Sequence, residues 1–274
     1  MMKTKHPKIL LGDLDGTLIR SDATISGTLR QALIRMTQAG HAFVICSGRT
    51  LESIQKLLHR LKLTDIVTMI VANNGSCIYD CISGKQLRSL KVCAHDIALL
   101  GEEAGRLGLY MHIYENKTLY SLRDSEEMRY YLSRQPLNYQ IIDDFGAVAP
   151  TGCEKIMLID LKDRSRLEAF QKKMVKCLEG SVQILFSEQC YLEVLTQDSG
   201  KGSAIPFLLE YLGMEPTDCY AVGDEENDIS MIETAHIGIA MRNAKDCVKQ
   251  VANFVTTKDH NQDGILEIIE RFFT

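Results

Sequence analysis

Two separate stretches of the sequence alternate short apolar segments with longer segments of helical pattern. In the first stretch the apolar segments are "KILLGD", "HAFVIC" and "TMIVANNG", and helical patterns such as "TLESIQKLLHRL" lie between them. An apolar segment without polar alternation is typical of a strand buried on both faces. Strands joined by helices pair in parallel, and the helices then cover both faces of the sheet. The sequence therefore predicts an α/β fold with a parallel sheet.

This alternation stops near Ser83 and returns after Lys201. Around Ser83, "CIYDCISGKQL" is typical of a hairpin, and the strand-like segments "LYMHIYENKTLYSL", "EKIMLIDL" and "VQILFSEQCYLEVL" follow it in a mixed order. After Lys201, strand segments such as "CYAVGD" and "HIGIAM" again alternate with helical ones. We therefore expect one parallel sheet interrupted by an inserted α+β domain, with the core in residues 1–82 and 192–274 and the insertion in residues 83–191.

The composition of the sequence indicates the number of domains, the compartment and the kind of binding partner. The 274 residues are 45% hydrophobic, which suits two modest domains. Nine cysteines, an odd number without a Cys-x-x-Cys pair, indicate free thiols in a reducing compartment. The net charge of -5 without a basic block argues against a nucleic-acid partner, and Asp13 interrupts the first apolar segment too early for a membrane span. We expect a cytoplasmic protein, a monomer or homodimer, with a small soluble substrate and no membrane partner.

Polar residues follow several of the predicted strands. In open parallel sheets, ligands bind at the carboxyl ends of the strands. Taken alone, "DLDG" is an ordinary turn, "CSGR" a strand-to-helix connection and "GDEEND" an acidic helix start. Their joint occurrence at strand ends of one sheet favours a functional site, formed by Asp13, Asp15, Ser47, Asn74, Asp224 and Asn227.

These motifs resemble those of a known family. "DLDGTL", "CSGRT", the lysine of "SGKGSA" and "GDEENDISMI" are similar, in this order, to the four motifs of the haloacid dehalogenase superfamily, in its Cof-type phosphatase branch with a type IIB cap. "ANNGSCIYD", "AMRNA" and "VTTKDHNQDGI" resemble accessory signatures of that branch. The resemblance implies a Rossmann-like core, a cap formed by the insertion and closing over the strand ends, and hydrolysis of phosphorylated metabolites such as sugar phosphates or phosphorylated cofactors.

The two aspartates of the first motif suit that chemistry. Asp13 is the candidate nucleophile, which would form an aspartyl-phosphate, and Asp15 is the candidate general acid and base. Two carboxylates would repel a phosphate dianion, so a hard cation with oxygen ligands is expected between them. We predict Mg²⁺, bound by Asp13, the backbone carbonyl of Asp15 and Asp224.

The other motifs supply the remaining candidates. Asp224, Asn227 and Asp228 share one side of a helix start by their spacing, and the resemblance gives Asp228 a supporting place in the metal site. Asn227 would orient the phosphate or Lys201. The remaining phosphate-binding candidates are the Ser47 hydroxyl and the Gly48 amide before a helix N-terminus, and Lys201 would stabilise the charge of the transition state.

Within the insertion, Tyr110, His112 and Tyr114 alternate along a predicted strand with Met111 and Ile113. We expect the apolar face to pack on helices of the insertion. The other face is either solvated or faces the active site, where His112 and Tyr114 would bind the organic part of the substrate.

Two other functions remain open at this point. A phosphomutase on the same fold would return the phosphoryl group to the substrate instead of to water. A non-catalytic protein that binds phosphorylated metabolites would keep the scaffold alone, although the sequence lacks none of the motif residues.

Overall fold

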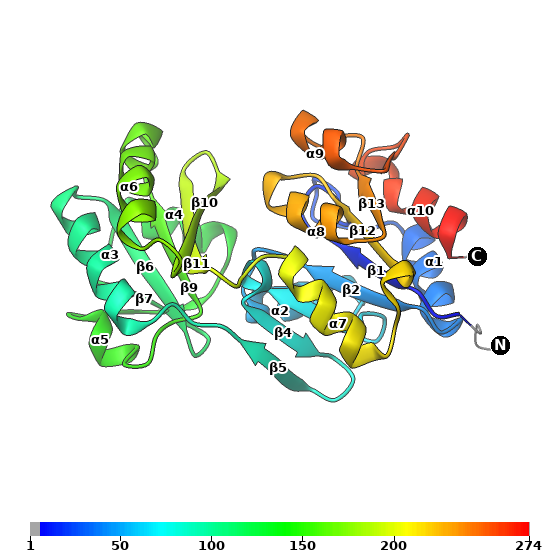
Figure 1. Ribbon diagram of the computed structural model, residues 1–274, viewed down its shortest axis with the longest axis horizontal. Helices are drawn as coiled ribbons and strands as arrows, with labels where there is room; N and C mark the ends of the chain where they lie inside the picture. The colour runs from blue at the N-terminus through cyan, green and yellow to red at the C-terminus, as the bar shows by residue number, and fades with distance from the viewer. Residues whose placement is uncertain (1–5, 274) are drawn as a thin grey trace. The chain divides into compact units, whose positions relative to one another are not determined.

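The computed structural model describes residues 6–273, which form two compact units (Figure 1). Unit 1 contains the chain up to Arg88 and again from Gly200, and unit 2 contains Ser89–Ser199. Both borders lie later in the chain than the predicted ones. The hairpin with Ser83 in its turn is part of the sheet of unit 1, and the strand from Tyr191 belongs to the sheet of unit 2.

Unit 1 is built on an eight-stranded sheet with the order β14-β13-β12-β1-β2-β3-β4-β5. The pairs from β14 to β3 are parallel, and β4 is antiparallel to β3. The predicted α/β class with a parallel sheet is confirmed. The strands are β1 Ile9–Gly12, β2 Ala42–Cys46, β3 Met69–Ala72, β4 Cys77–Asp80, β5 Lys85–Ser89, β12 Cys219–Gly223, β13 Ile237–Ala240 and β14 Phe254–Val255.

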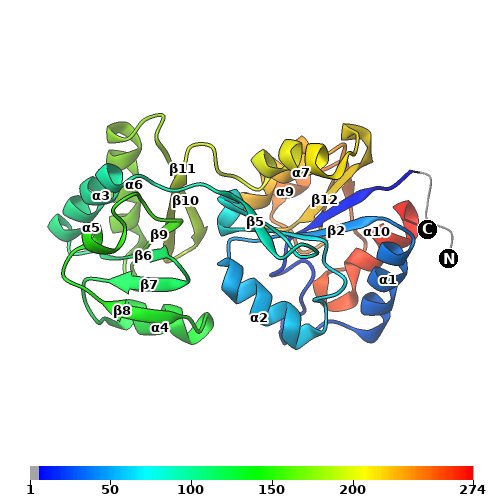
Figure 2. The ribbon, with the colours of Figure 1, turned by 90° about the horizontal axis from the view of Figure 1, so that it is seen from below.

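Helices cover both faces of this sheet, with α7 on one side and α1 and α2 on the other (Figure 2). The strand β1 shows why its sequence is apolar throughout. Leu10 packs in the cluster with α1, α2 and α10, whereas Ile9 and Leu11 pack in the cluster with α7. The helices are α1 Gly27–Gln38, α2 Leu51–Leu61, α7 Ile205–Leu212, α8 Ile229–Thr234, α9 Asp246–Val251 and α10 Gly264–Phe272.

Unit 2 contains a six-stranded sheet with the order β10-β11-β9-β6-β7-β8. Every pair in it is antiparallel except β7 with β8. Its strands are β6 Tyr110–Glu115, β7 Thr118–Ser121, β8 Asn138–Ile141, β9 Lys155–Ile159, β10 Val182–Glu188 and β11 Tyr191–Thr196. Its helices are α3 Ala94–Arg106, α4 Glu126–Arg134, α5 Phe145–Val148 and α6 Arg164–Cys177.

The two faces of β6 are both buried. Met111 and Ile113 pack with residues of α3 and α6, as predicted for the apolar face. The expectation that the opposite face is solvated or open to a substrate is wrong, because the side chains of His112 and Tyr114 are only 1% and 3% exposed. The reason is the helix α4, whose Met128 and Tyr131 pack on this face of the sheet (Figure 2).

None of the helices in the described part of the chain is both long enough and apolar enough to cross a membrane.

Candidate active site

The sheet of unit 1 places three sequence motifs at one edge. Gly12, the last residue of β1, lies opposite Val222 of β12 and Ile45 of β2. Asp13, Asp224 and Ser47 follow the ends of these three parallel strands, so they project from the same edge of the sheet. The Asp13 amide continues the pairing by donating to the Val222 carbonyl over 3.0 Å.

Three carboxylates meet at this edge. Asp13, Asp224 and Asp228 are buried, and each offers one oxygen within 4.8 Å of the others. Asp224 Oδ1 accepts a hydrogen bond of 2.7 Å from the Thr17 hydroxyl. Asp228 Oδ2 accepts from the amides of Asp224 and Glu225, at 2.9 and 3.0 Å. These bonds fix Asp224 and Asp228 relative to the end of β12.

Burial disfavours the ionised form of the carboxyl groups in this cluster unless a positive charge lies nearby. It raises the pKa of Asp13 well above its usual range, an effect that Lys201 opposes and that the charges of Asp228 and Asp224 increase. Burial also raises the pKa of Asp224 to about 7, against the effect of the Thr17 hydrogen bond. Oxygen ligands that are close together and costly to ionise fit a hard divalent cation.

Lys201 supplies one positive charge to the cluster. Its buried Nζ donates to Asp13 Oδ1 over 2.7 Å and to Asp228 Oδ1 over 2.5 Å. Burial alone would lower the pKa of Lys201, but the two carboxylates outweigh that effect and raise it. Lys201 is therefore charged, and it holds the carboxylate of Asp13 in one orientation.

The loop that carries Lys201 is packed against η1 (Asn73–Gly75), at the end of β3. Gly75 has a φ of +96°, and a Cβ atom at this position would lie 2.1 Å from the carbonyl oxygen of Gly200. Only glycine allows this close approach of two backbones. The sequence segment "ANNG" therefore has a structural role in positioning Lys201.

Asp15 lies outside the acidic cluster. Its carboxylate is 56% exposed and binds Arg49 with two hydrogen bonds, from Nε to Oδ2 at 2.6 Å and from Nη2 to Oδ1 at 2.8 Å. The sequence shows Arg49 in the "CSGRT" motif, but nothing in its pattern indicates this ion pair.

The phosphate-binding candidates lie near Asn74. Ser47 is buried, and its hydroxyl accepts from the Arg49 amide at 3.2 Å. Gly48 lies close to the Asn74 side-chain amide, since a Cβ at Gly48 would be 3.1 Å from Asn74 Nδ2. Asn227 Nδ2 donates to Asn74 Oδ1 over 3.0 Å, so Asn74 connects Asn227 to this loop.

His112 and Tyr114 belong to unit 2 and are part of its buried core. The His112 ring lies 4.7 Å from the Tyr131 ring between their centroids. Burial, together with the charge of Lys155, lowers the pKa of His112 to about 3, so the imidazole is neutral at physiological pH. Neither side chain is available to a ligand in this structure.

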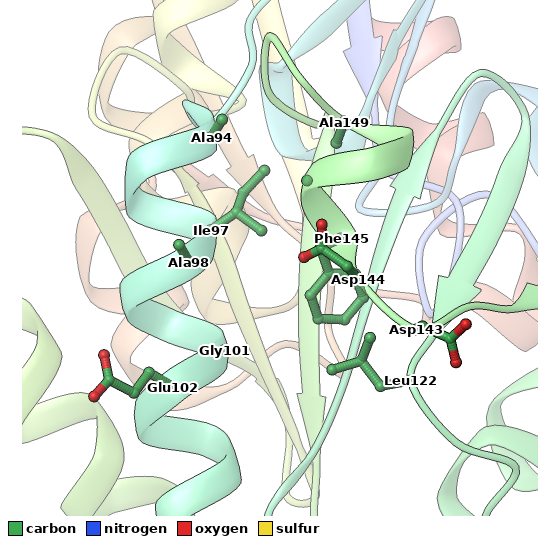
Figure 3. A pocket seen from close by; sticks show the side chains of 11 residues that line it. Ala94, Ile97, Ala98, Gly101, Glu102, Leu122, Asp143, Asp144, Phe145 and Ala149 are labelled. Atoms are coloured by element: carbon green, nitrogen blue, oxygen red, sulfur yellow. The ribbon is translucent and has the colours of Figure 1, made fainter.

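Unit 2 also has a cavity of about 260 Å³ beside α3 and α5 (Figure 3). Its lining includes the carboxylates of Glu102, Asp143 and Asp144 and no lysine or arginine. These charges would repel a phosphate. The cluster of unit 1 is also acidic, but Lys201 contacts two of its carboxylates and the cluster can hold a metal ion, so it is the better candidate for a phosphate site.

A family profile described as haloacid dehalogenase-like hydrolase matches residues 10–269. The chain belongs to this hydrolase family. A Bacillus subtilis relative, 5-amino-6-(5-phospho-D-ribitylamino)uracil phosphatase YwtE, is 30% identical over 298 residues, covering 97% of this chain and 98% of the relative. The crystal structure of a haloacid dehalogenase-like hydrolase from Bacteroides thetaiotaomicron has a TM-score of 0.87 and 28% identity, covering 97% and 100% of the two chains.

The family assignment confirms the resemblance seen in the motifs. The same fold occurs in the subclass IIB sugar phosphatase BT4131, with a TM-score of 0.83, 20% identity, and coverage of 97% of this chain and 98% of that one. The protein described by the present sequence is therefore a phosphatase, and its family acts on small phosphorylated substrates. Hydrolases of this family generally use a divalent metal, and the buried aspartate cluster could bind one.

Proposed function

We propose that this hydrolase is a Mg²⁺-dependent phosphomonoesterase acting on phosphorylated metabolites such as sugar phosphates or phosphorylated cofactors, through an aspartyl-phosphate on Asp13. The observation that carries the proposal is the buried Asp13 carboxylate, held by Lys201 beside Asp224 and Asp228 at the end of β1. The name of the Bacillus relative supports the substrate class, because it specifies a phosphorylated ribitylaminouracil.

The metal site would use the residues of the acidic cluster. Asp13, Asp224 and the backbone carbonyl of Asp15 would be the protein ligands, and Asp228 would support them through its bonds to the Asp224 amide and Lys201. All of these ligands are oxygen atoms, which favours Mg²⁺ over softer metals. The bound ion would offset the repulsion between the carboxylates and the phosphate and would polarise a phosphoryl oxygen.

Asp13 would then attack the phosphorus atom. One Asp13 carboxylate oxygen forms a bond to phosphorus as the bond to the ester oxygen breaks, and the leaving alkoxide takes a proton from Asp15. In the second step a water molecule gives a proton to Asp15 and attacks phosphorus, which releases inorganic phosphate and restores Asp13. Lys201 fixes the attacking carboxylate and provides positive charge near the phosphoryl oxygens.

The loop residues would hold the phosphate during both steps. The Ser47 hydroxyl and the Gly48 amide would donate to phosphate oxygens, and Asn227 would be kept in place by Asn74. Asp15 can act as the acid only after its carboxylate leaves Arg49, because both of its oxygens accept hydrogen bonds from the guanidinium of that residue.

The test is phosphate release from a panel of phosphorylated metabolites with Mg²⁺, comparing the wild type with Asp13→Asn. We expect Asp13→Asn to abolish turnover while its circular dichroism spectrum stays unchanged. Asp65→Asn, at an exposed aspartate of the same unit, is the matched control and should keep full activity. An Asp13→Asn variant with a tenth or more of the wild-type rate would refute the assignment. Formation of an isomeric phosphate instead of inorganic phosphate would indicate a mutase.

A further inference from the structure

The side chain of Asn243 joins the first sequence motif to the end of β12. Its Nδ2 donates to the Gly16 carbonyl over 2.8 Å and, over a longer distance of 3.4 Å, to Asp224 Oδ2. Its Oδ1 accepts a hydrogen bond of 3.1 Å from the His260 amide, at the start of η5 (His260–Gln262). Both ends of this side-chain amide are therefore engaged.

Two sequence segments that the proposed reaction leaves without a role supply these contacts. Asn243 belongs to "AMRNA", and His260 belongs to "VTTKDHNQDGI". The side chain of Asp259 accepts hydrogen bonds from the Asn261 and Gln262 amides, which caps η5 and fixes the position of its first residue. A capped turn next to the first-motif loop thus sets the orientation of Asn243.

Asp224 receives a donor at each of its carboxylate oxygens. The Thr17 hydroxyl donates to Oδ1 over 2.7 Å, and Asn243 donates to Oδ2. Gly16 also lies against this carboxylate, since a Cβ atom at Gly16 would be 2.2 Å from Oδ2. Together these contacts restrict the rotation of the carboxylate, so that it meets a metal ion in one orientation.

The hydrogen bond to Gly16 acts on a second proposed metal ligand, the backbone carbonyl of Asp15. Gly16 has a φ of +78°, and glycine leaves the two peptide groups beside it free to rotate over a wide range. Asn243 holds the peptide group that follows Gly16, and the Asp15 carbonyl belongs to the peptide group that precedes it. Fixing one peptide group reduces the orientations open to the other.

Contacts of this kind affect metal affinity more than folding. Asn243 is exposed, so it adds no apolar contact to the core. Replacing a residue that orients metal ligands through hydrogen bonds typically lowers metal affinity by about 10–100-fold. The reason is that a ligand with more orientations loses more conformational freedom when the ion binds.

We propose that Asn243 is a positioning residue for the metal site, which orients Asp224 and the Asp15 carbonyl through its two donor hydrogen bonds. The inference rests on the proposed function for the identity of the metal ligands, and it adds a residue that no step of the proposed reaction uses. Asn243 acts through Asp224 and Gly16, and not by contact with the ion or the substrate.

The test measures metal binding directly, without a substrate. Mn²⁺ is the probe, because it shares the preference of Mg²⁺ for octahedral oxygen ligands and its free aqua ion gives an EPR signal that decreases on binding. The Mn²⁺ Kd is measured for the wild type, Asn243→Ala and Asn243→Gln. The matched control is Asn253→Ala, which also removes a side-chain bond to the backbone, the 2.7 Å bond from the Gly238 amide to Asn253 Oδ1.

We expect Asn243→Ala to raise the Mn²⁺ Kd by about tenfold, at the lower end of the range for such residues. Asn243→Gln keeps an amide donor on a longer side chain and should raise the Kd less, and Asn253→Ala should leave it unchanged. Both alanine variants should keep the wild-type circular dichroism spectrum, because both asparagines are exposed.

The phosphatase assay adds a readout that a purely structural role would not change. Asn243→Ala should need a higher Mg²⁺ concentration for its half-maximal rate, and excess Mg²⁺ should restore most of the wild-type rate. A loss of kcat that is the same at every Mg²⁺ concentration would contradict the positioning role.

Failure of this inference and failure of the proposed function give different results. The positioning role is overturned if the wild type binds no Mn²⁺, or if Asn243→Ala raises the Mn²⁺ Kd no more than Asn253→Ala does. Absence of phosphate release from every substrate would refute the proposed phosphomonoesterase alone, since the Mn²⁺ measurement needs no turnover.

Discussion

The contact between Gly75 and Gly200 predicts a large effect of adding one methyl group. In Gly75→Ala the new Cβ atom would lie 2.1 Å from the Gly200 carbonyl oxygen and 2.8 Å from the Gly200 nitrogen. These are backbone atoms, so the two loops must separate. The left-handed φ of +96° costs an alanine about 1–2 kcal/mol, and the steric overlap adds about 1–3 kcal/mol. We expect the free energy of unfolding to fall by about 2–5 kcal/mol in total.

The variant Gly213→Ala is the control that separates the cost of the steric overlap from the cost of the backbone conformation. Gly213 also has a left-handed φ, +64°, but no atom lies within 4 Å of its Cβ position, so only the backbone cost of about 1–2 kcal/mol applies. Urea unfolding followed by circular dichroism measures both variants. Because Gly200 precedes Lys201, Gly75→Ala should also reduce phosphatase activity, whereas Gly213→Ala should not. If Gly75→Ala is no less stable than Gly213→Ala and fully active, the contact does not position Lys201.

Three further outcomes can be checked. Treatment with a chelator should remove phosphatase activity and added Mg²⁺ should restore it, and full activity in the chelator would contradict the proposed metal site. Asp15→Asn should slow hydrolysis of alkyl phosphates more than that of aryl phosphates, because only the poor leaving groups need a proton, and equal losses would exclude Asp15 as the acid. In unit 2, hydrogen bonds from Arg106 and Lys173 lower the pKa of Glu103 to about 2. That pKa is lower than in the unfolded chain, so the stabilisation is present at neutral pH and is lost as the pH falls from about 4.3 toward 2. Glu103→Gln should reduce the difference between the urea midpoints at pH 5 and pH 3, while Glu102→Gln, at an exposed neighbour on α3, should leave it unchanged.

The sequence alone determined the parallel part of the sheet of unit 1 and the place of its polar motifs, but not the hairpin around Ser83, which it assigned to the insertion. Continuous apolar segments such as 9–12 and 42–46 can be buried only in a sheet that is covered on both faces, and helices between them require parallel pairing. Once the strands are parallel, the residues that follow them lie at one edge. Local pattern is enough for this step, because each strand and each helix is specified by its own residues.

Contacts between distant residues were decided only by the tertiary structure. The pairing of Arg49 with Asp15 and that of Asn74 with Asn227 join segments that no periodicity relates. The two bonds from Lys201 depend on the fit of its loop against Gly75. Such contacts depend on side-chain geometry across the folded chain, which residue types and spacing do not specify.

The face of β6 with His112 and Tyr114 shows the same limit within unit 2. Its alternating pattern predicted a strand correctly, but the environment of each face depends on which other elements pack there. The helix α4 is short and mostly polar, and its few apolar side chains, Met128 and Tyr131 among them, are enough to bury this face. The sequence determined which side chains share a face, and only the packing of α4 decided that this face is closed.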